Sequence, residues 1–187
     1  MFPKIDDLLE MRTIEGSRIE YKKGWNPVKI LHTICAFAND IENIGGGYIV
    51  IGVEEKDGSP QLPPVGIDKG QIDSINKELL NLSYLLDPVY IPSPEYAVVD
   101  GKDLLLNEAI VGPSRPYRCP DSISKDKKDR AGSSYYIRKL SSTIKAGKDD
   151  EMRLFDVSNH RPFDCRANPS ATIADLRPSL LYEYLGR

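Results

Sequence analysis

The sequence predicts a globular domain of mixed helices and strands, built around one strand that is covered on both faces. Three observations predict this arrangement. Residues 48–53 form a nearly continuous apolar run, which is typical of a central strand. Residues 26–40, just before it, have the apolar spacing of a helix with one buried face. The glycines at 45–47 form the turn between them. The length of 187 residues suits one domain, or one domain with an appendage.

The elements before the central strand are predicted from spacing and from helix-start residues. Residues 5–12 have helical spacing, and residues 17–23 alternate in the manner of a strand with one polar face. Asn26-Pro27 favours a helix start, because asparagine can cap a helix and proline fits its first position. We expect Asn39, at the end of that helix, to cap it or to bond a loop backbone.

The elements after the central strand follow from the same reasoning. Asp100-Gly101 is a hairpin signal between two predicted strands. Prolines make residues 61–67 irregular or an edge strand. The remaining predictions are helices at 70–86, 148–157 and about 172–185, and strands at 89–99, 104–111 and 133–140.

Charge is distributed unevenly along the chain, whose net charge is −3. Residues 112–148 contain ten Lys/Arg and three Asp/Glu, a balance of +7, so the remainder carries −10. A local basic segment can form an electrostatic footprint for polyanions, or it can be a solvated surface loop. Charge alone favours the solvated loop.

Composition excludes several classes of protein. The three cysteines are widely spaced and include no CxxC pair, so neither a zinc site nor a disulfide framework is indicated. No apolar run approaches the ~18–20 residues of a membrane span, and the N-terminus is not a signal peptide. We therefore expect a cytoplasmic protein without membrane contact. The glycine turn lacks a following Gly-Lys-Ser/Thr, so we expect no nucleotide hydrolysis in this segment.

Three motifs together resemble a known family, the Schlafen AlbA-type domain. They are Glu15-x-x-x-x-Glu20-Tyr-Lys22, the segment Ile34-Cys-Ala-Phe-Ala-Asn39, and Gly46-Gly-Tyr-Ile-Val-Ile-Gly-Val53-Glu-Glu. The later Tyr135-Tyr-Ile-Arg138 is similar to the closing strand of that domain. The resemblance implies an α+β fold with a mixed β-sheet flanked by helices. We expect this domain to span residues 1–148, with residues 149–187 as a helical extension or a linker to a missing downstream region.

The resemblance also implies a role in nucleic-acid binding. Such domains occur in bacterial transcriptional regulators and in RecG-related or divergent ATPase proteins, so we expect further domains in the full-length chain. The partner would be DNA or RNA, contacted through its phosphate backbone, and no cofactor is needed. The candidate binding residues lie at the end of the first strand, in the basic loop and on the closing strand: Lys22, Lys23, Arg115, Arg118, Lys127, Lys128 and Arg138.

A metal-dependent endoribonuclease is the first alternative, because a similar domain in animal Schlafen proteins carries a three-carboxylate site. Matching that motif gives Glu15, Glu20 and one of Glu54 or Glu55 as catalytic residues, with Mg²⁺ or Mn²⁺ held by Glu15, Glu20 and Glu54. Glutamate replaces the aspartate that the family more often has at the last position. A simpler reading pairs Glu20 with Lys22 or with a lysine on a neighbouring strand, and makes residues 54–57 a polar turn. The second alternative is a protein-interaction or oligomerisation domain, such as a homodimer.

Overall fold

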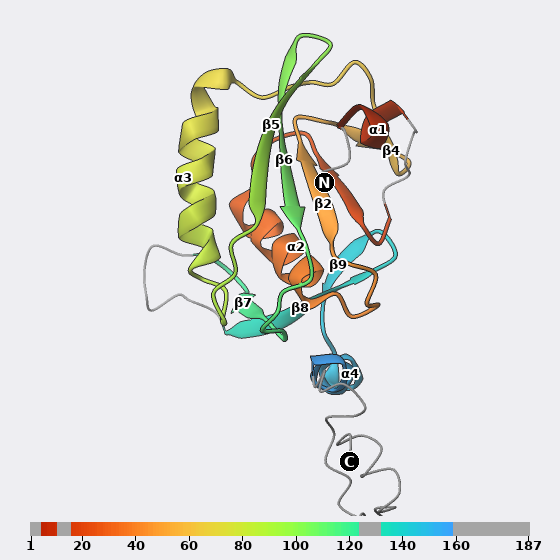
Figure 1. The fold of residues 1–187 in the computed structure, drawn as a ribbon, viewed down its shortest axis with the longest axis vertical. Coiled ribbons are helices and arrows are strands. Elements are labelled where there is room, and N and C mark those ends of the chain that lie inside the picture. Colours follow the sequence, from red (N-terminus) through yellow and green to blue (C-terminus); the bar gives the residue numbers. More distant parts are fainter. Residues whose placement is uncertain (1–4, 11–15, 124–131, 159–187) are drawn as a thin grey trace, which may run out of the picture.

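The central strand predicted from the sequence is β2 (Gly47–Ile51), an inner strand of a four-stranded sheet (Figure 1). The computed structural model describes residues 5–10, 16–123 and 132–158. In chain order the elements are α1 (Ile5–Glu10), β1 (Ile19–Lys22), α2 (Pro27–Asn39), β2, β3 (Glu55–Lys56), β4 (Ser59–Pro60), η1 (Lys69–Gln71), α3 (Ile72–Ser83), β5 (Ser93–Val99), β6 (Lys102–Ala109), β7 (Arg118–Pro120), β8 (Ser133–Lys139), β9 (Ser142–Lys145) and α4 (Lys148–Ser158).

The four-stranded sheet has the order β1-β2-β6-β5 and mixes parallel with antiparallel neighbours. β1 pairs in parallel with β2, which places Glu20 opposite Ile49, and α2 is the connection between these two strands. β6 is antiparallel to both β2 and β5. The expected α+β fold with a mixed sheet and flanking helices is therefore confirmed, and the helix predicted at 148–157 is present as α4.

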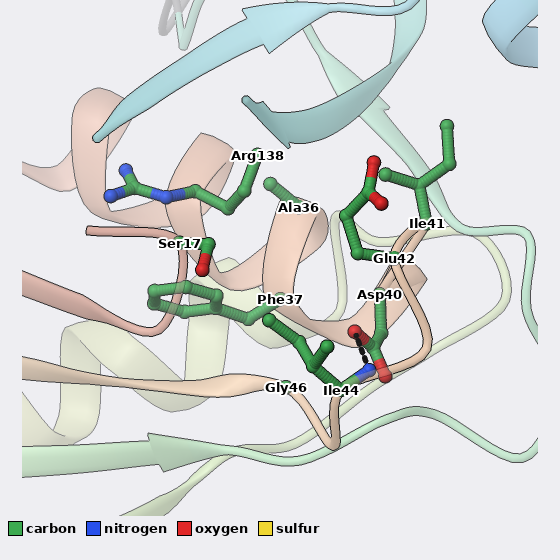
Figure 2. Close-up of a pocket in the computed structure, with 9 residues that line it drawn as sticks. All are labelled: Ser17, Ala36, Phe37, Asp40, Ile41, Glu42, Ile44, Gly46 and Arg138. Carbon is green, nitrogen blue, oxygen red and sulfur yellow. Dashed lines mark hydrogen bonds between the residues drawn. The ribbon is translucent and has the colours of Figure 1, made fainter. Parts of the chain in front are cut away.

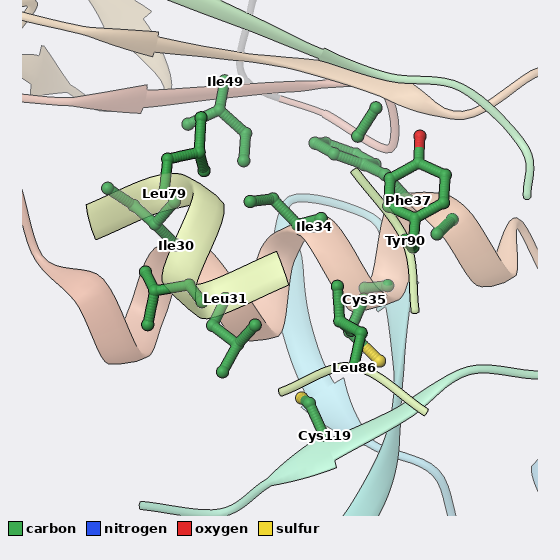
Figure 3. Close-up of a cluster of buried hydrophobic side chains, with 14 of the residues drawn as sticks. Ile30, Leu31, Ile34, Cys35, Phe37, Ile49, Leu79, Leu86, Tyr90 and Cys119 are labelled. Carbon is green, nitrogen blue, oxygen red and sulfur yellow. The ribbon is translucent and has the colours of Figure 1, made fainter. Parts of the chain in front are cut away.

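Helix α2 is buried because it lies between the four-stranded sheet and a smaller sheet of order β7-β8-β9. One apolar cluster joins α2 to Ile49 of β2 and Cys119 of β7 (Figure 3). The same cluster includes Leu105 of β6 and Tyr136 of β8. The inner face of α3 completes this cluster with Ile75, Leu79 and Leu82. A helix that is apolar on nearly every side needs such cover on both flanks.

The opposite face of the four-stranded sheet has its own cluster. The alternation of β1 sends Ile19 and Tyr21 to this face, where Leu8 and Leu9 of α1 cover them. Glu20 is therefore turned toward α2 and the small sheet. α4 docks separately, through Leu154 against Ile41 and Ile137.

The end of α2 corrects the expectation that Asn39 caps this helix. Asp40 is the cap residue, in the left-handed conformation at φ 41°. Its carboxylate accepts the backbone N–H group of Ile44 (Figure 2) and also that of Gly45. Asn39 instead bonds the small sheet, because its amide nitrogen donates to the carbonyls of Tyr117 and Tyr136. The second expectation for Asn39, a bond to loop backbone, is correct for Tyr117, which precedes β7, whereas Tyr136 lies within β8.

Strand bounds differ from the predictions where prolines intervene. β5 begins at Ser93 and not at residue 89, since Pro88 and Pro92 have no N–H for a ladder. The predicted Asp100-Gly101 turn joins β5 to β6, and both residues have positive φ, which the twist of a two-residue hairpin favours. The helix predicted at 172–185 lies outside the described residues. Within them, no helix is both long enough and apolar enough to cross a membrane.

Candidate nucleic-acid interface

The carboxylate of Glu20 is held by two cations. Its Oε2 accepts a hydrogen bond of 2.5 Å from the guanidinium of Arg138, and its Oε1 is ion-paired with Nζ of Lys22. The side chains of Glu20 and Arg138 are only 9% and 4% exposed, whereas that of Lys22 is 23% exposed. The reading that pairs Glu20 with Lys22 is therefore confirmed, with Arg138 as a second partner.

Arg138 connects three parts of the fold. Its guanidinium donates to the carbonyl of Gly16 at 2.6 Å and to the hydroxyl of Thr143 at 3.0 Å, and it lies over the ring of Phe37, 5.3 Å from the centroid. Figure 2 shows Arg138 beside Phe37 and Ser17. A buried guanidinium with this many acceptors fixes the small sheet against β1 and α2. Its burial leaves it little surface for a ligand.

The N-terminal end of α2 gathers exposed cations. Lys23, directly after β1, is 62% exposed and contacts Glu54 at 3.1 Å, a surface pair that contributes little to stability. Lys29 is exposed in the first turn of α2, which has no acidic residue. Negative charge is favoured at a helix N-terminus, so this end has the charge pattern of an anion-binding surface. Lys29 was not identified from the sequence, although its place three residues after the cap Asn26 could have revealed it.

At the C-terminal end of α2 the cation is buried and bonded to the backbone of the helix end. Arg115 is buried and donates to the carbonyls of Asn39 and Asp40 at 3.3 and 3.1 Å, and to the side chain of Asn43 at 3.0 Å. These bonds satisfy carbonyls that the helix leaves without partners. The structure thus places this predicted phosphate ligand inside the fold, where it stabilises the helix end.

Among the remaining predicted cations, the structure describes Arg118. Arg118 on β7 is 51% exposed and donates through Nε and a terminal nitrogen to Asp87, at 2.9 and 2.8 Å. Hydrogen bonding to Asp87 raises the pKa of Arg118 above its ordinary value. Lys127 and Lys128 lie outside the described residues.

The predicted carboxylates that the structure describes have separate partners. Glu54 contacts Lys23, and Glu55 accepts a hydrogen bond of 2.5 Å from the backbone N–H of Gly58. Glu15 lies outside the described residues. In the part of the chain that the structure describes, no three His, Cys, Asp or Glu side chains come together as metal ligands. The Mg²⁺ or Mn²⁺ site therefore stays a prediction.

A second polar cluster on the small sheet was not found from the sequence. Asp121 accepts the hydroxyl of Tyr136 at 2.9 Å and pairs with Lys145 at 2.8 Å. The ring of His32 stacks on Tyr136 with centroids 3.9 Å apart, and its Nε2 lies 3.0 Å from the carbonyl oxygen of Pro120. No sequence spacing predicts this cluster, because its members come from separate segments of the chain.

The pKa values of this cluster follow from burial and hydrogen bonding. Burial lowers the pKa of His32, against opposing effects of the Pro120 carbonyl and of Asp121. Burial raises the pKa of Asp121, but hydrogen bonds from Lys145, Ser134 and Tyr136 outweigh it, so the pKa of Asp121 lies below its ordinary value. Neutral His32 and ionised Asp121 are therefore the forms that the fold favours.

Comparison with known proteins places the chain in a family. The family model described as Schlafen, AlbA_2 matches residues 15–147. A solved structure of a protein from Corynebacterium diphtheriae aligns with a TM-score of 0.50 and 18% identity, covering 88% of this chain and 32% of that one. The N-terminal domain of a RecG-related protein from Nitrosomonas europaea aligns with a TM-score of 0.47 and 27% identity, covering 59% of this chain and 74% of that domain.

No curated protein sequence matches this chain. The chain spans about a third of the length of the Corynebacterium protein, and at 18% identity that likeness shows the fold alone. The family match covers residues 15–147, from just before β1 to the residue before α4. Because it covers more than half of the sequence, the chain belongs to the Schlafen, AlbA_2 family.

Proposed function

We propose that this chain binds nucleic acid through the phosphate backbone, and that the contact lies at the N-terminal end of α2. One observation carries the proposal. Glu20, the acidic residue of the family motif, is bound by two cations, so the three side chains Glu20, Lys22 and Arg138 together have a charge of +1. A neutralised carboxylate has little left to attract Mg²⁺, whereas the partly exposed Lys22 is held in place for an anion.

The surroundings of Lys22 support the same reading. Lys23 and Lys29 are exposed nearby, at the end of β1 and in the first turn of α2. The helix dipole adds positive potential there. Phosphate contacts of this kind are largely independent of base sequence and depend steeply on salt. Arg115 and Arg138 are left out of the contact surface because both are buried.

Membership of the Schlafen, AlbA_2 family supports this function, since nucleic-acid binding is what the resemblance of the motifs implies. We further propose that the domain serves a larger regulator-like protein in the cytoplasm and brings that protein to DNA or RNA. The basic segment after Gly112 would add contacts through Arg118.

The test measures binding of labelled duplex DNA and of a labelled RNA hairpin by fluorescence anisotropy over a range of salt concentrations. The variant carries Lys22→Gln, Lys23→Gln and Lys29→Gln together. Each lost phosphate contact lowers the slope of log K against log salt by about 0.7–0.9, so the triple variant should lose about 2 to 3 units of slope. Comparison of the two probes shows which nucleic acid the surface prefers.

The matched control changes three other exposed cations to glutamine: Lys139, Lys148 and Arg153. They lie around α4 and the end of β8, and Arg153 contacts Glu42 beyond the other end of α2. The control variant should keep the full salt slope. Equal losses in both triple variants would mean diffuse attraction without a site, and unchanged binding in the lysine variant would reject the proposed surface.

The endoribonuclease alternative is tested in the same samples by adding MgCl₂ or MnCl₂ to the RNA hairpin. We expect no metal-dependent cleavage. If cleavage does occur, and if the exposed change Glu54→Gln abolishes it without altering the thermal unfolding curve, then the carboxylates act on a metal and the binding proposal is replaced.

A further inference from the structure

A cleft remote from the lysines around α2 remains unused by the proposed function. It has a volume of about 340 Å³ and lies between the segment before β5 and the segment after β6. Its rim includes Val89, Ile91 and Ile110, which are 52%, 56% and 55% exposed. Three aliphatic side chains that are half exposed around one hollow form an apolar patch of the kind that marks interaction sites.

The floor of the cleft is aromatic and rigid. Tyr90 and Tyr117 are buried and meet edge to face, with ring centroids 5.4 Å apart. The hydroxyl of Tyr90 donates to the carbonyl of Ile110 at 2.8 Å, and that of Tyr117 accepts the backbone N–H of Ser114 at 3.0 Å. Both hydroxyl groups are thus engaged within the fold. The floor therefore offers ring faces and edges to an apolar group, in a shape that is already formed.

The walls are also fixed to the body of the domain. The backbone of Tyr117 is held by Asn39 of α2, whose side-chain oxygen accepts its N–H at 2.6 Å and whose nitrogen donates to its carbonyl at 2.8 Å. A Cβ atom at Gly112 would lie 2.1 Å from the Tyr117 ring, so the chain passes this ring as closely as it can. A preformed site loses little conformational entropy on binding.

Glu108 is the acidic side chain in the cleft lining. One of its carboxylate oxygens accepts the hydroxyl of Tyr48 at 3.1 Å. Among the residues that the structure describes, no lysine, arginine or histidine lines the cleft. Charge complementarity therefore favours an occupant that places a cation beside its apolar group.

We propose that this cleft binds a segment of a partner protein that presents a large apolar side chain next to a lysine or arginine. The apolar side chain packs on Tyr90 and Tyr117 between the aliphatic residues of the rim, and the cation faces Glu108. The half-exposed rim suits an anchor residue that projects from a partner's surface. The volume of the cleft is also at the small end of the roughly 300–1,000 Å³ range of small-molecule pockets, which suits a single side chain.

The test uses the dipeptide probes acetyl-Phe-Lys-amide and acetyl-Phe-Glu-amide, titrated into ¹⁵N-labelled protein of residues 1–187. The lysine probe should shift the amide signals of Val89, Ile91 and Ile110 in a saturable way. It should bind about three-fold or more tightly than the glutamate probe, which is the usual effect of one exposed charge pair. Equal binding of both probes, or shifts confined to other regions, overturns the proposal.

Variants distinguish binding in the cleft from non-specific binding elsewhere on the surface. Ile110→Asp places a charge on the rim and should weaken the lysine probe about ten-fold or more. Glu108→Gln should remove the preference for lysine over glutamate. Val65→Asp is the matched control, since Val65 is a 44%-exposed aliphatic residue near the opposite end of β6, and it should leave binding unchanged.

Two further readouts identify other occupants and other failures. Sedimentation of the wild type against Ile110→Asp detects a second copy of this chain in the cleft, and a dimer that this substitution dissolves overturns the proposal. The Ile110→Asp variant should still bind nucleic acid with the full salt slope. The two proposals therefore fail independently of each other.

Discussion

The positively charged side chains around the two halves of α2 differ in how exposed they are. The C-terminal half is surrounded by buried arginines, with Arg115 on the last carbonyls and Arg138 over the ring of Phe37. The N-terminal half is approached by lysines that remain partly or fully exposed, at Lys22 and Lys29. A cation at a helix C-terminus stabilises the fold, whereas one at the N-terminus opposes the helix dipole.

This difference separates structural cations from cations that remain available to a ligand. Arg115 and Arg138 donate hydrogen bonds to backbone carbonyls, and Arg138 also pairs with a buried carboxylate. Replacing either arginine should therefore lower the free energy of unfolding. The exposed Lys23 and Lys29 gain little from their positions in the folded chain, so replacing them should weaken binding more than it lowers stability. Glu20 links the two halves, because one of its oxygens contacts Lys22 and the other Arg138.

The largest expected effect is on stability, from Arg138→Ala. This change leaves Glu20 buried with one cation and removes the donors to Gly16 and Thr143. Breaking a buried ion pair by removing one partner costs about 3–5 kcal/mol of unfolding free energy. Chemical denaturation measures the loss.

The double variant Glu20→Gln/Arg138→Met serves as the control for Arg138, because it removes both charges. It should recover part of the loss, since the buried carboxylate that loses its guanidinium partner is also removed. A loss below about 1 kcal/mol for Arg138→Ala would mean that the pair acts as a surface pair, and the contrast between the two halves of α2 would fail.

Arg115→Ala should have the second largest effect, about 2–3 kcal/mol, because hydrogen bonds from a charged donor to the carbonyls of Asn39 and Asp40 are lost. Denaturation measures the stability, and anisotropy at a temperature where the variant is folded measures the binding. The salt slope for nucleic acid should not change. A slope reduced by about one unit would instead give Arg115 a phosphate contact.

Arg118→Gln should have a smaller effect, on binding alone. We expect the salt slope to fall by about one unit, as for one phosphate contact, with little change in stability. Arg153→Gln is closely matched, since both arginines are 51% exposed and each contacts one carboxylate. If both variants bind like the wild type, the contact surface is confined to the lysines around α2.

The smallest expected effect is a change in the pH dependence of stability when His32 is replaced by glutamine. Its folded-state pKa is lowered by burial, so below its ordinary value of 6.5 the unfolded chain takes up this proton before the folded one does. The histidine contribution to stability is therefore complete above pH 6.5 and decreases as the pH falls toward its lowered pKa. Denaturation curves at several pH values should show a flatter profile for His32→Gln.

The control for His32 is His160→Gln, which changes the other histidine of the sequence. It should leave the acid side of the profile as in the wild type. Asp121 adds to the loss at lower pH, because its lowered pKa makes the folded state favour the ionised carboxylate, and its contribution disappears as the pH falls through that pKa. If His32→Gln leaves the dependence of the unfolding free energy on pH unchanged, the buried neutral imidazole does not cause that dependence.

The sequence by itself determined the family, the strands of the four-stranded sheet and the helix α2, but it did not predict the short strands β3, β4, β7 and β9. Local features suffice for this: Asn26-Pro27 starts α2, the turn at Asp100-Gly101 needs positive φ, and the apolar run of β2 requires cover on both faces. These signals depend on neighbouring residues, and the structure agrees with them. Asn39 was harder to predict, because its partners Tyr117 and Tyr136 are remote in sequence.

Only the tertiary structure decided which cations are structural. Arg115, Arg118 and Arg138 are equivalent in the sequence, yet burial commits the first and third to the fold and leaves Arg118 at the surface. The second partner of Glu20 was equally hidden, since Arg138 reaches it from β8. The physical reason is that a residue's charge is local, whereas its desolvation and its hydrogen-bond partners are supplied by segments far away along the chain.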